Sequence, residues 1–255
     1  MPEKPTEDAR FYGRRKGKPL RATRQRLLDT MLPALTLPLA GLGEGERLDP
    51  RGLFPRPVDQ LWLEIGFGGG EHLVAQAAAH PEVGLIGSEV FAYGVGKALS
   101  QIDETGVDNI RLWPEDVRQV LPALPDGCLQ RLFVLFPDPW PKRRHARRRM
   151  IQPARLDDFA RLLADGGELR VASDDMGYVR WTLMHVTAHP AFRWTAQGPT
   201  DWRERPADWV ETRYEAKALQ AGRKPAYLIF RRRPRAADPG TLAEAPAGEG
   251  ADNNP

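Results

Sequence analysis

The sequence predicts an α/β protein built on a doubly wound, mostly parallel sheet that ends in an antiparallel hairpin. Short apolar runs typical of buried strands alternate with segments of helical periodicity along most of the chain. The first run leads directly into a glycine-rich turn, which is the arrangement of a nucleotide-binding βαβ unit. The last two runs, at 192–194 and 226–231, are joined by a polar loop, and we expect them to complete the sheet as a hairpin.

The expected elements follow one another in a regular order. Strands are expected at 61–65, 83–88, 109–113, 132–136, 168–172, 192–194 and 226–231. Helices are expected at 21–35, 71–79, 92–104, 151–163 and 178–186, with a further short helix that ends near residue 121. Five strands that alternate with helices therefore precede the final hairpin.

Changes in composition divide the chain into four parts. Residues 1–35 form a basic N-terminal arm and a helix, and 36–57 form an irregular linker rich in Pro, Gly and Leu. Residues 58–233 carry the alternating elements and form the main domain. Residues 234–255 are rich in Ala, Pro and Gly, and we expect them to be a disordered tail.

The composition excludes several classes of protein. The 255 residues are 41% apolar, which is enough to bury a large core. Cys128 is the single cysteine, so neither an internal disulfide nor a cysteine-based zinc site can form, which suits a reducing cytoplasm. The five histidines have no spacing typical of metal ligands, and no segment resembles a signal peptide or a membrane span. We expect a cytoplasmic protein without a metal, a membrane contact or an obligate protein partner.

Glycines and acids mark the ends of the first two strands. Gly66 and Gly68 follow the first strand, where glycines permit positive φ angles and let the backbone approach a ligand closely. No third glycine completes the Gly-x-Gly-x-x-Gly fingerprint from Gly66, and no phosphate-binding Gly-Lys-Ser/Thr is present, so nucleoside triphosphates are disfavoured. Glu89 ends the second strand, 25 residues after Glu64. It can accept hydrogen bonds from ribose hydroxyls or, alternatively, stabilise the start of the next helix.

The segment 132–149 is the most informative part of the sequence. A buried strand ends in Pro137-Asp138-Pro139-Trp140-Pro141, and six of the next eight residues are Lys or Arg. The prolines should hold their neighbours in extended geometry and place Asp138 and Trp140 on a stiff loop at the carboxyl end of the strand. A simpler interpretation is a turn followed by a solvated basic face. The combination of a fixed acid, an aromatic ring and a cationic cluster instead favours an enzyme that acts on nucleic acid.

Two further acids follow strands of the same sheet. Asp116 comes after the third strand, where it can lie near an adenine amino group or act as a helix N-cap. Asp174 follows the fifth strand. Because the carboxyl ends of parallel strands meet at one edge, we expect five acids to converge there. They are Glu64, Glu89, Asp116, Asp138 and Asp174.

Two basic segments are candidates for contacts with an RNA backbone. Residues 10–26 contain eight Lys or Arg and no acid, with Phe11 and Tyr12 beside the cations. Such a mixture can follow phosphates and stack on bases, although a solvated tail is an equally good interpretation of this arm alone. The cations assigned to backbone contacts are Arg14, Arg15, Lys16, Arg143, Arg144 and Arg147.

Four motifs together resemble the bacterial tRNA (guanine-N7)-methyltransferases. They are Leu63-Glu64-Ile65-Gly66-Phe67-Gly68, Glu89-Val90, Phe136-Pro137-Asp138-Pro139-Trp140-Pro141-Lys142, and Thr212-Arg213-Tyr214-Glu215 with Gly222. The resemblance spans roughly residues 11–232, and the arm at 12–17 takes part in it. Two positions depart from the family pattern. Ser88 stands where an apolar residue is usual, and Pro141 stands where His is common.

The resemblance implies a Rossmann-like methyltransferase sheet, S-adenosylmethionine as methyl donor and a guanine of the tRNA variable loop as acceptor. By motif, the family's donor-binding positions fall on Glu64, Glu89, Asp116 and Asp138, and Asp138 is also its catalytic residue. Its substrate-binding positions fall on Lys142, Asp174, Thr212, Arg213, Tyr214 and Glu215. Gly66 and Gly68 would form the donor turn.

N7 of guanine has an in-plane lone pair and no proton, so its methylation needs no general base. Catalysis would then depend on alignment and on carboxylates that stabilise the charge appearing on the purine. Asp138 would accept hydrogen bonds from the guanine or orient the donor's amine.

Two alternatives remain at this point. The first is an amino-group methyltransferase acting on DNA or protein, since such enzymes also carry a proline-containing acidic loop after the fourth strand. The second is a non-catalytic RNA-binding protein on the same fold, in which Glu64 and Glu89 would be structural.

Overall fold

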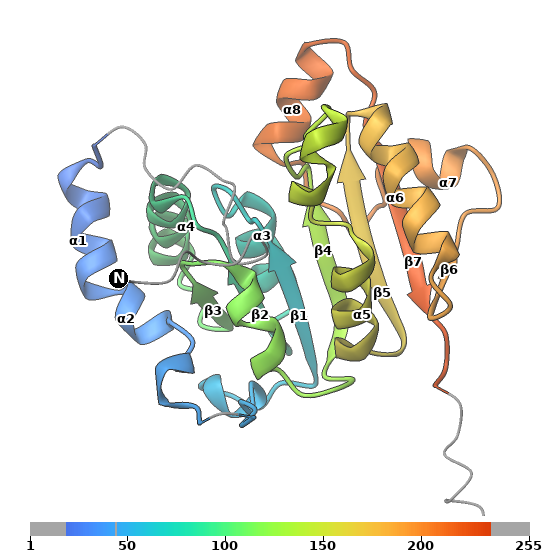
Figure 1. The fold of residues 1–255 in the computed structure, drawn as a ribbon. Helices are drawn as coiled ribbons and strands as arrows, with labels where there is room; N and C mark the ends of the chain where they lie inside the picture. The colour runs from blue at the N-terminus through green and yellow to red at the C-terminus, as the bar shows by residue number, and fades with distance from the viewer. Residues whose placement is uncertain (1–18, 44, 236–255) are drawn as a thin grey trace, which may run out of the picture.

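The computed structural model describes residues 19–43 and 45–235, and it contains one mixed sheet of seven strands (Figure 1). The strands lie in the order β3-β2-β1-β4-β5-β7-β6, and β7 alone runs in the opposite direction to the other six. They are β1 Gln60–Ile65, β2 Val83–Ser88, β3 Ile110–Trp113, β4 Leu129–Leu135, β5 Leu163–Ser173, β6 Phe192–Trp194 and β7 Ala226–Arg232. The predicted doubly wound sheet with a terminal antiparallel hairpin is confirmed.

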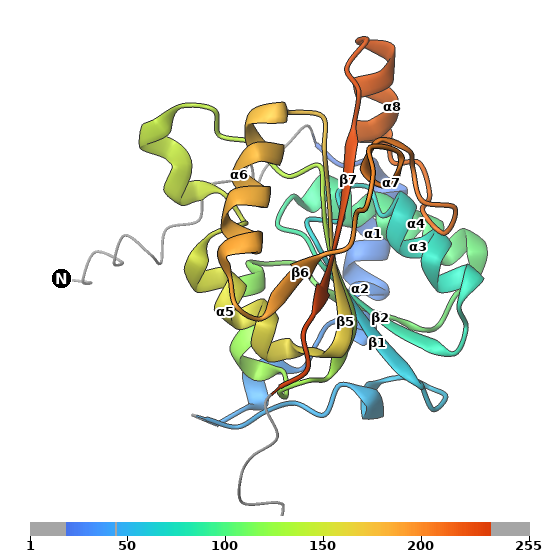
Figure 2. The same ribbon diagram turned by 90° about the vertical axis from the view of Figure 1, so that its right-hand side faces the viewer.

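Helices cover both faces of the sheet, as Figure 2 shows for α3 and α4 on one side and α5 and α6 on the other. The helices are α1 Ala22–Thr30, α2 Leu32–Leu35, α3 Glu71–Ala79, α4 Ala92–Thr105, α5 Pro153–Leu162, α6 Met176–Ala188, α7 Thr200–Arg203 and α8 Arg213–Gln220. Short 3₁₀ turns are η2 Leu39–Gly41, η3 Arg51–Leu53, η4 Val117–Gln119, η5 Leu121–Ala123 and η6 Arg143–Arg148. Two apolar clusters, one on each face, form the core. None of the helices in the described part of the chain is long and apolar enough to cross a membrane.

The helix expected at 21–35 is divided into α1 and α2. Pro33 lies in the first turn of α2, and its missing N–H and fixed φ prevent α1 from continuing through this point. Leu27 of α1 is buried against the α4 side of the core. Thr36 then forms a bridge to Leu112 of β3, so the segment after α2 lies along the edge of the sheet.

The fifth strand is longer than the sequence predicted. The helix before it ends at Leu162, and β5 begins at Leu163, five residues before the expected start. The pairing with β4 shifts register within this extension, where Gly166 adopts a φ of 79°. A glycine tolerates this angle, so the extra residues are accommodated as an irregularity rather than as the end of a helix.

The outer parts of the predicted domain division lie mostly outside the described residues. These are the arm at 1–18, with its expected phosphate contacts Arg14, Arg15 and Lys16, and most of the tail, 236–255. Arg235, just before that tail, donates hydrogen bonds to Asp165 and to the carbonyl oxygens of Arg161 and Leu163. Ordered contacts therefore reach Arg235.

Candidate active site

A cavity of about 400 Å³ lies at the carboxyl ends of β1, β2 and β4. The strand order reverses between β1 and β4, and a crevice at such a switch point is where open α/β sheets bind their ligands. The cavity lining comes from the glycine turn after β1, the start of α4, the Asp116 loop, the loop after β4 and the first residues of α8. Its volume falls in the range of about 300–1,000 Å³ that is usual for small-molecule sites.

The glycine turn presents bare backbone to this cavity. Gly66 has a φ of 74°, and nothing lies within 4 Å of the point where a Cβ would stand. Gly68 also has a positive φ, of 58°. A Cβ on Gly94 would collide with the carbonyl oxygen of Gly68, so the start of α4 can approach the turn only because residue 94 is glycine. Both glycines predicted to form the turn therefore line the cavity.

Glu89 joins the glycine turn to the start of α4. One carboxylate oxygen accepts a hydrogen bond from the Gly68 N–H and the other accepts one from the Phe91 N–H, both at 2.8 Å. Burial raises the pKa of this carboxyl above its ordinary value, against the opposing effect of the backbone donors. A carboxylate can accept about four hydrogen bonds, so two backbone donors leave sites for ligand hydroxyls. The two interpretations of Glu89 thus coexist, because the residue supports the helix start and faces the cavity.

The loop after β4 is strained. Phe136 and Trp140 have φ angles of 48° and 43°, although each precedes a proline and was expected to be extended. That expectation is wrong for both residues, and for Trp140 the reason is a contact made by Arg149. The Arg149 side chain donates hydrogen bonds to the carbonyl oxygens of Pro139 at 2.9 Å and Trp140 at 3.0 Å. Left-handed non-glycine residues cost about 1–3 kcal/mol each and tend to gather at functional sites.

Arg149 was expected to belong to the basic surface, but it turns inward. Its guanidinium also lies over the Trp181 ring, 4.5 Å from the centroid. Trp181 packs against the core, and its indole N–H donates to the Ile151 carbonyl at 2.6 Å. Arg149 therefore connects the strained loop to the core below it.

Asp138 lies between the two strained residues and lines the cavity. Its side chain is open to solvent, yet the surrounding protein removes part of the water that would stabilise the charge, and this desolvation raises the pKa of the carboxyl. The Asp138 charge also contributes to the raised pKa of Glu89. Two carboxylates are therefore held in one cavity.

Trp140 forms an aromatic wall of the same cavity. The Arg148 guanidinium lies 4.9 Å from the Trp140 ring centroid, and the His145 ring meets it edge-on at 5.7 Å. These contacts fix the orientation of the indole. The sequence identified the loop but did not assign Trp140 or Arg148 to the site; the signal for Trp140 was its place between Pro139 and Pro141.

The motif at 212–215 divides into two pairs. Arg213 and Tyr214 line the cavity, and Tyr214 is 52% exposed with its ring against the Gly68 turn. Thr212 and Glu215 are buried instead. The Thr212 hydroxyl accepts from the Glu215 N–H as the N-cap of α8, and the Glu215 carboxylate accepts from the Tyr227 hydroxyl at 2.5 Å and from Arg205 at 3.2 Å. The geometry gives no support to a substrate contact by this second pair.

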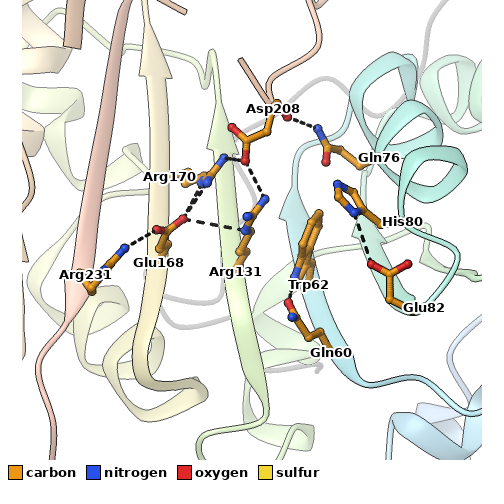
Figure 3. Close-up of polar contacts among 10 residues, drawn as sticks. All are labelled: Gln60, Trp62, Gln76, His80, Glu82, Arg131, Glu168, Arg170, Asp208 and Arg231. Atoms are coloured by element: carbon orange, nitrogen blue, oxygen red, sulfur yellow. Dashed lines mark hydrogen bonds and ion pairs between the residues drawn. The ribbon is translucent and has the colours of Figure 1, made fainter. Parts of the chain in front are cut away.

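Ion pairs hold the loop that leads into α8 against strands β4 and β5. Figure 3 shows the Asp208 carboxylate between Arg131 of β4 and Arg170 of β5, with ion pairs of 3.0 and 2.9 Å. The Asp208 carbonyl also accepts from Gln76 of α3 at 2.7 Å. Glu168 pairs with Arg170 from the other side. Because these contacts fix the loop, they fix where α8 places Tyr214.

The remaining predicted acids occupy different positions. Asp116 lines the cavity and is also the N-cap of η4, accepting from the Arg118 N–H at 3.0 Å. Glu64 does not line it: the side chain is buried and contacts His72 at 2.8 Å, on the α3 side of the sheet. Asp174 pairs with Arg223 at 2.5 Å, beside the cavity rather than in its wall. The expected convergence therefore holds for three of the five acids.

The basic residues of 142–147 that were predicted to contact RNA lie at the rim of the cavity. Lys142 is exposed just before η6, and Arg143, Arg144 and Arg147 of η6 are exposed as well. None of them lines the cavity itself. Lys97 of α4, which the sequence did not single out, does line it and pairs with Glu71 at 3.0 Å. Within residues 19–43 and 45–235, no group of three or more His, Cys, Asp or Glu is placed to hold a metal ion.

Comparison with known proteins identifies the family. A family model described as a putative methyltransferase matches residues 59–228. A tRNA (guanine-N(7)-)-methyltransferase of Paramagnetospirillum magneticum is 51% identical over 90% of this chain and 95% of its own. The protein of the same name from Rhizobium meliloti is 49% identical over 87% of this chain and 94% of its own. The chain belongs to the tRNA (guanine-N7)-methyltransferase family.

Membership in the tRNA (guanine-N7)-methyltransferase family confirms the resemblance that the motifs indicated. The chain is a methyltransferase, and its cofactor is S-adenosylmethionine. An rRNA methylase from Streptococcus thermophilus is a more distant likeness, with a TM-score of 0.47 and 12% identity over 69% of this chain and 87% of that chain. That likeness is too weak to bear on the reaction.

Proposed function

We propose that this protein transfers a methyl group from S-adenosylmethionine to N7 of a guanine in the variable loop of tRNA, in the cytoplasm. The observation that carries the proposal is the single cavity in which a bare glycine turn, Glu89 and Asp138 face the same space. The names of the relatives at 46–51% identity support the choice of a tRNA guanine over an amino group of DNA or protein.

The residues at the cavity fit this donor. Gly66 leaves open backbone where a ligand can lie, and Glu89 retains acceptor sites for two ribose hydroxyls. Asp116 also lines the cavity, where its carboxylate can accept a hydrogen bond from an adenine amino group. Glu64 would act indirectly, because its contact with His72 fixes the strand end that carries the turn.

The donor supplies an activated methyl group on a sulfonium sulfur, which N7 of guanine can accept without a base. The protein's contribution is alignment and charge. Asp138 places a carboxylate beside the acceptor position and stabilises the positive charge that the purine gains. Arg149 keeps that carboxylate in place by holding the strained loop.

Trp140 and Tyr214 would enclose the acceptor. Both rings line the cavity. Trp140 is held in place by its contact with Arg148, and Tyr214 by the ion pairs of the loop before α8. Aromatic faces of this kind stack on purines and exclude water. Arg213, Lys142 and Asp174 would contact the nucleotides around the acceptor.

Phosphates of tRNA would be bound by Arg143, Arg144 and Arg147 at the rim and by the arm that carries Arg14, Arg15 and Lys16. Such contacts position the RNA without reading its sequence.

The proposal is tested by incubating the purified protein with tRNA transcripts and isotopically labelled donor, followed by digestion and mass spectrometry of the nucleosides. The expected product is labelled 7-methylguanosine. Label on an exocyclic amine, or no label in any nucleoside despite donor binding, would overturn the proposal.

A further inference from the structure

A second hollow lies beside the end of α8. Its volume is about 480 Å³, and it is lined by Arg203, Leu219, Lys224, Pro225 and Tyr227. These residues come from α7, the end of α8, the turn after it and the start of β7. Nothing in the donor or acceptor chemistry described above uses them.

This hollow opens at the same edge of the sheet as the cavity. Because β7 is antiparallel, its start lies beside the end of β5, where Ala226 pairs with Ser173 and Tyr227 with Ala172. Figure 1 shows α8 above that end of β5. The α8 helix lines the cavity with Arg213 and Tyr214 at its start and lines the hollow with Leu219 near its end. Its eight residues rise about 12 Å, roughly three nucleotides of a stacked strand at 3.4 Å each.

The charge of the hollow is unbalanced. Arg205 and Arg223, its neighbours along the chain, are each paired with a carboxylate. In the described part of the chain, neither Arg203 nor Lys224 has a carboxylate within ion-pair distance. The Arg203 guanidinium lies over the Trp202 ring, 3.9 Å from its centroid, which holds the cation at the hollow's wall.

The floor between these cations is apolar. Leu219 is a large apolar side chain that is 49% exposed, and Pro225 and Tyr227 complete the surface. Two cations without carboxylate partners, beside an apolar surface, suit a nucleotide, because its phosphate is charged and its base is flat and largely apolar on its faces.

We propose that this hollow binds the RNA strand next to the acceptor, with Arg203 and Lys224 on two neighbouring phosphodiester groups and Leu219 against the adjoining sugar or base. The inference rests on the proposed function, since it assumes that RNA occupies the cavity. The bound groups belong to the substrate's backbone, so their loss affects substrate binding and leaves the chemical step intact.

The test measures tRNA affinity against salt for Arg203→Gln, Lys224→Gln and the double variant. Each single change should reduce the slope of log affinity against log salt by about 0.7–0.9 and weaken binding roughly three-fold near physiological salt, and the double change roughly ten-fold. KM for tRNA should rise by the same factors, while kcat and donor affinity stay at wild-type values. Arg203→Lys keeps the charge and should keep the slope.

Arg193→Gln is the matched control, because Arg193 is an exposed cation on β6 outside the hollow. Wild-type slopes in the Arg203 and Lys224 variants, or an equal loss in Arg193→Gln, would overturn the inference. A third result would also overturn the inference: variants in which tRNA affinity is unchanged but inhibition by inorganic phosphate, measured at constant ionic strength, is altered. The hollow would then bind a free anion rather than the RNA backbone. Failure of the proposed function would look different, because the wild-type protein would then not methylate tRNA at all.

Discussion

Arg149 offers the sharpest test of how the acidic loop is held. Its planar fork binds two carbonyl oxygens of a loop in which Phe136 and Trp140 are strained. The compact ammonium of a lysine does not reproduce this fork, so at least one of the two bonds should be lost. The two strained residues cost about 2–6 kcal/mol together. Each hydrogen bond from the guanidinium offsets about 1.5–3 kcal/mol. Losing one bond therefore removes a large part of what holds the loop in its geometry.

For Arg149→Lys we expect kcat to fall about 10- to 100-fold, the equivalent of about 1.4–2.8 kcal/mol, because the loop would hold Asp138 in place for only a fraction of the time. Donor affinity depends on Glu89 and the glycine turn, so it should change less than three-fold. This is well below the ten-fold change in affinity that a loss of about 1.4 kcal/mol would cause. Single-turnover rates at saturating donor and tRNA measure the first effect, and calorimetry with the donor measures the second.

Arg161→Lys is the matched control. The Arg161 side chain also donates to two carbonyl oxygens, those of Leu124 at 2.9 Å and Leu121 at 2.6 Å, but outside the lining of the cavity. Both variants should lose a similar free energy of unfolding, about 1–3 kcal/mol. Equal falls in kcat for the two variants, or a wild-type rate in Arg149→Lys, would refute the argument that Arg149 positions the loop.

Two further predictions concern the carboxylates. Glu89→Gln leaves a single acceptor oxygen for the Gly68 and Phe91 N–H groups and the donor's hydroxyls, so donor affinity should fall at least ten-fold by calorimetry; unchanged affinity would remove Glu89 from the site. Asp138→Asn should fold and bind tRNA but lose about 10²–10³-fold in single-turnover rate. Desolvation raises the pKa of Asp138, and the ionised form is the active one. The wild-type rate should therefore fall on acidification at a pH above 3.8, the ordinary pKa of Asp. This acid limb of the pH–rate profile should shift in Asp138→Asn. An unshifted limb would mean that another group controls it.

Much of the fold could be predicted from the sequence because periodicity and glycine position report local structure. The bounds of α3, β2 and β6 match the predicted ranges, and the glycine turn lies where a buried strand ends. The start of β5 could not be predicted, since Gly166 lies inside a strand irregularity rather than at a helix end. Local preference was overridden there by pairing with β4.

The candidate site was predictable to the level of its loops but not of its side-chain directions. Glu64 belongs to a strand whose successive side chains face opposite sides, and its contact with His72, eight residues later, could not be read from spacing. Thr212 and Glu215 have the Thr-x-x-Glu spacing of a helix start, a signal that the sequence offered and that would have separated them from Arg213 and Tyr214. The inward turn of Arg149 depends on tertiary contacts alone.

The central claim is that the attacking atom is N7 of a variable-loop guanine, and replacing that atom tests it most directly. A tRNA assembled with 7-deazaguanosine at the variable-loop guanines keeps every other group of the base but has a carbon in place of N7. With labelled donor and saturating RNA, the unmodified tRNA should gain label in the variable loop and the deaza tRNA should gain none while binding equally well. Equal labelling of the two RNAs would contradict the account.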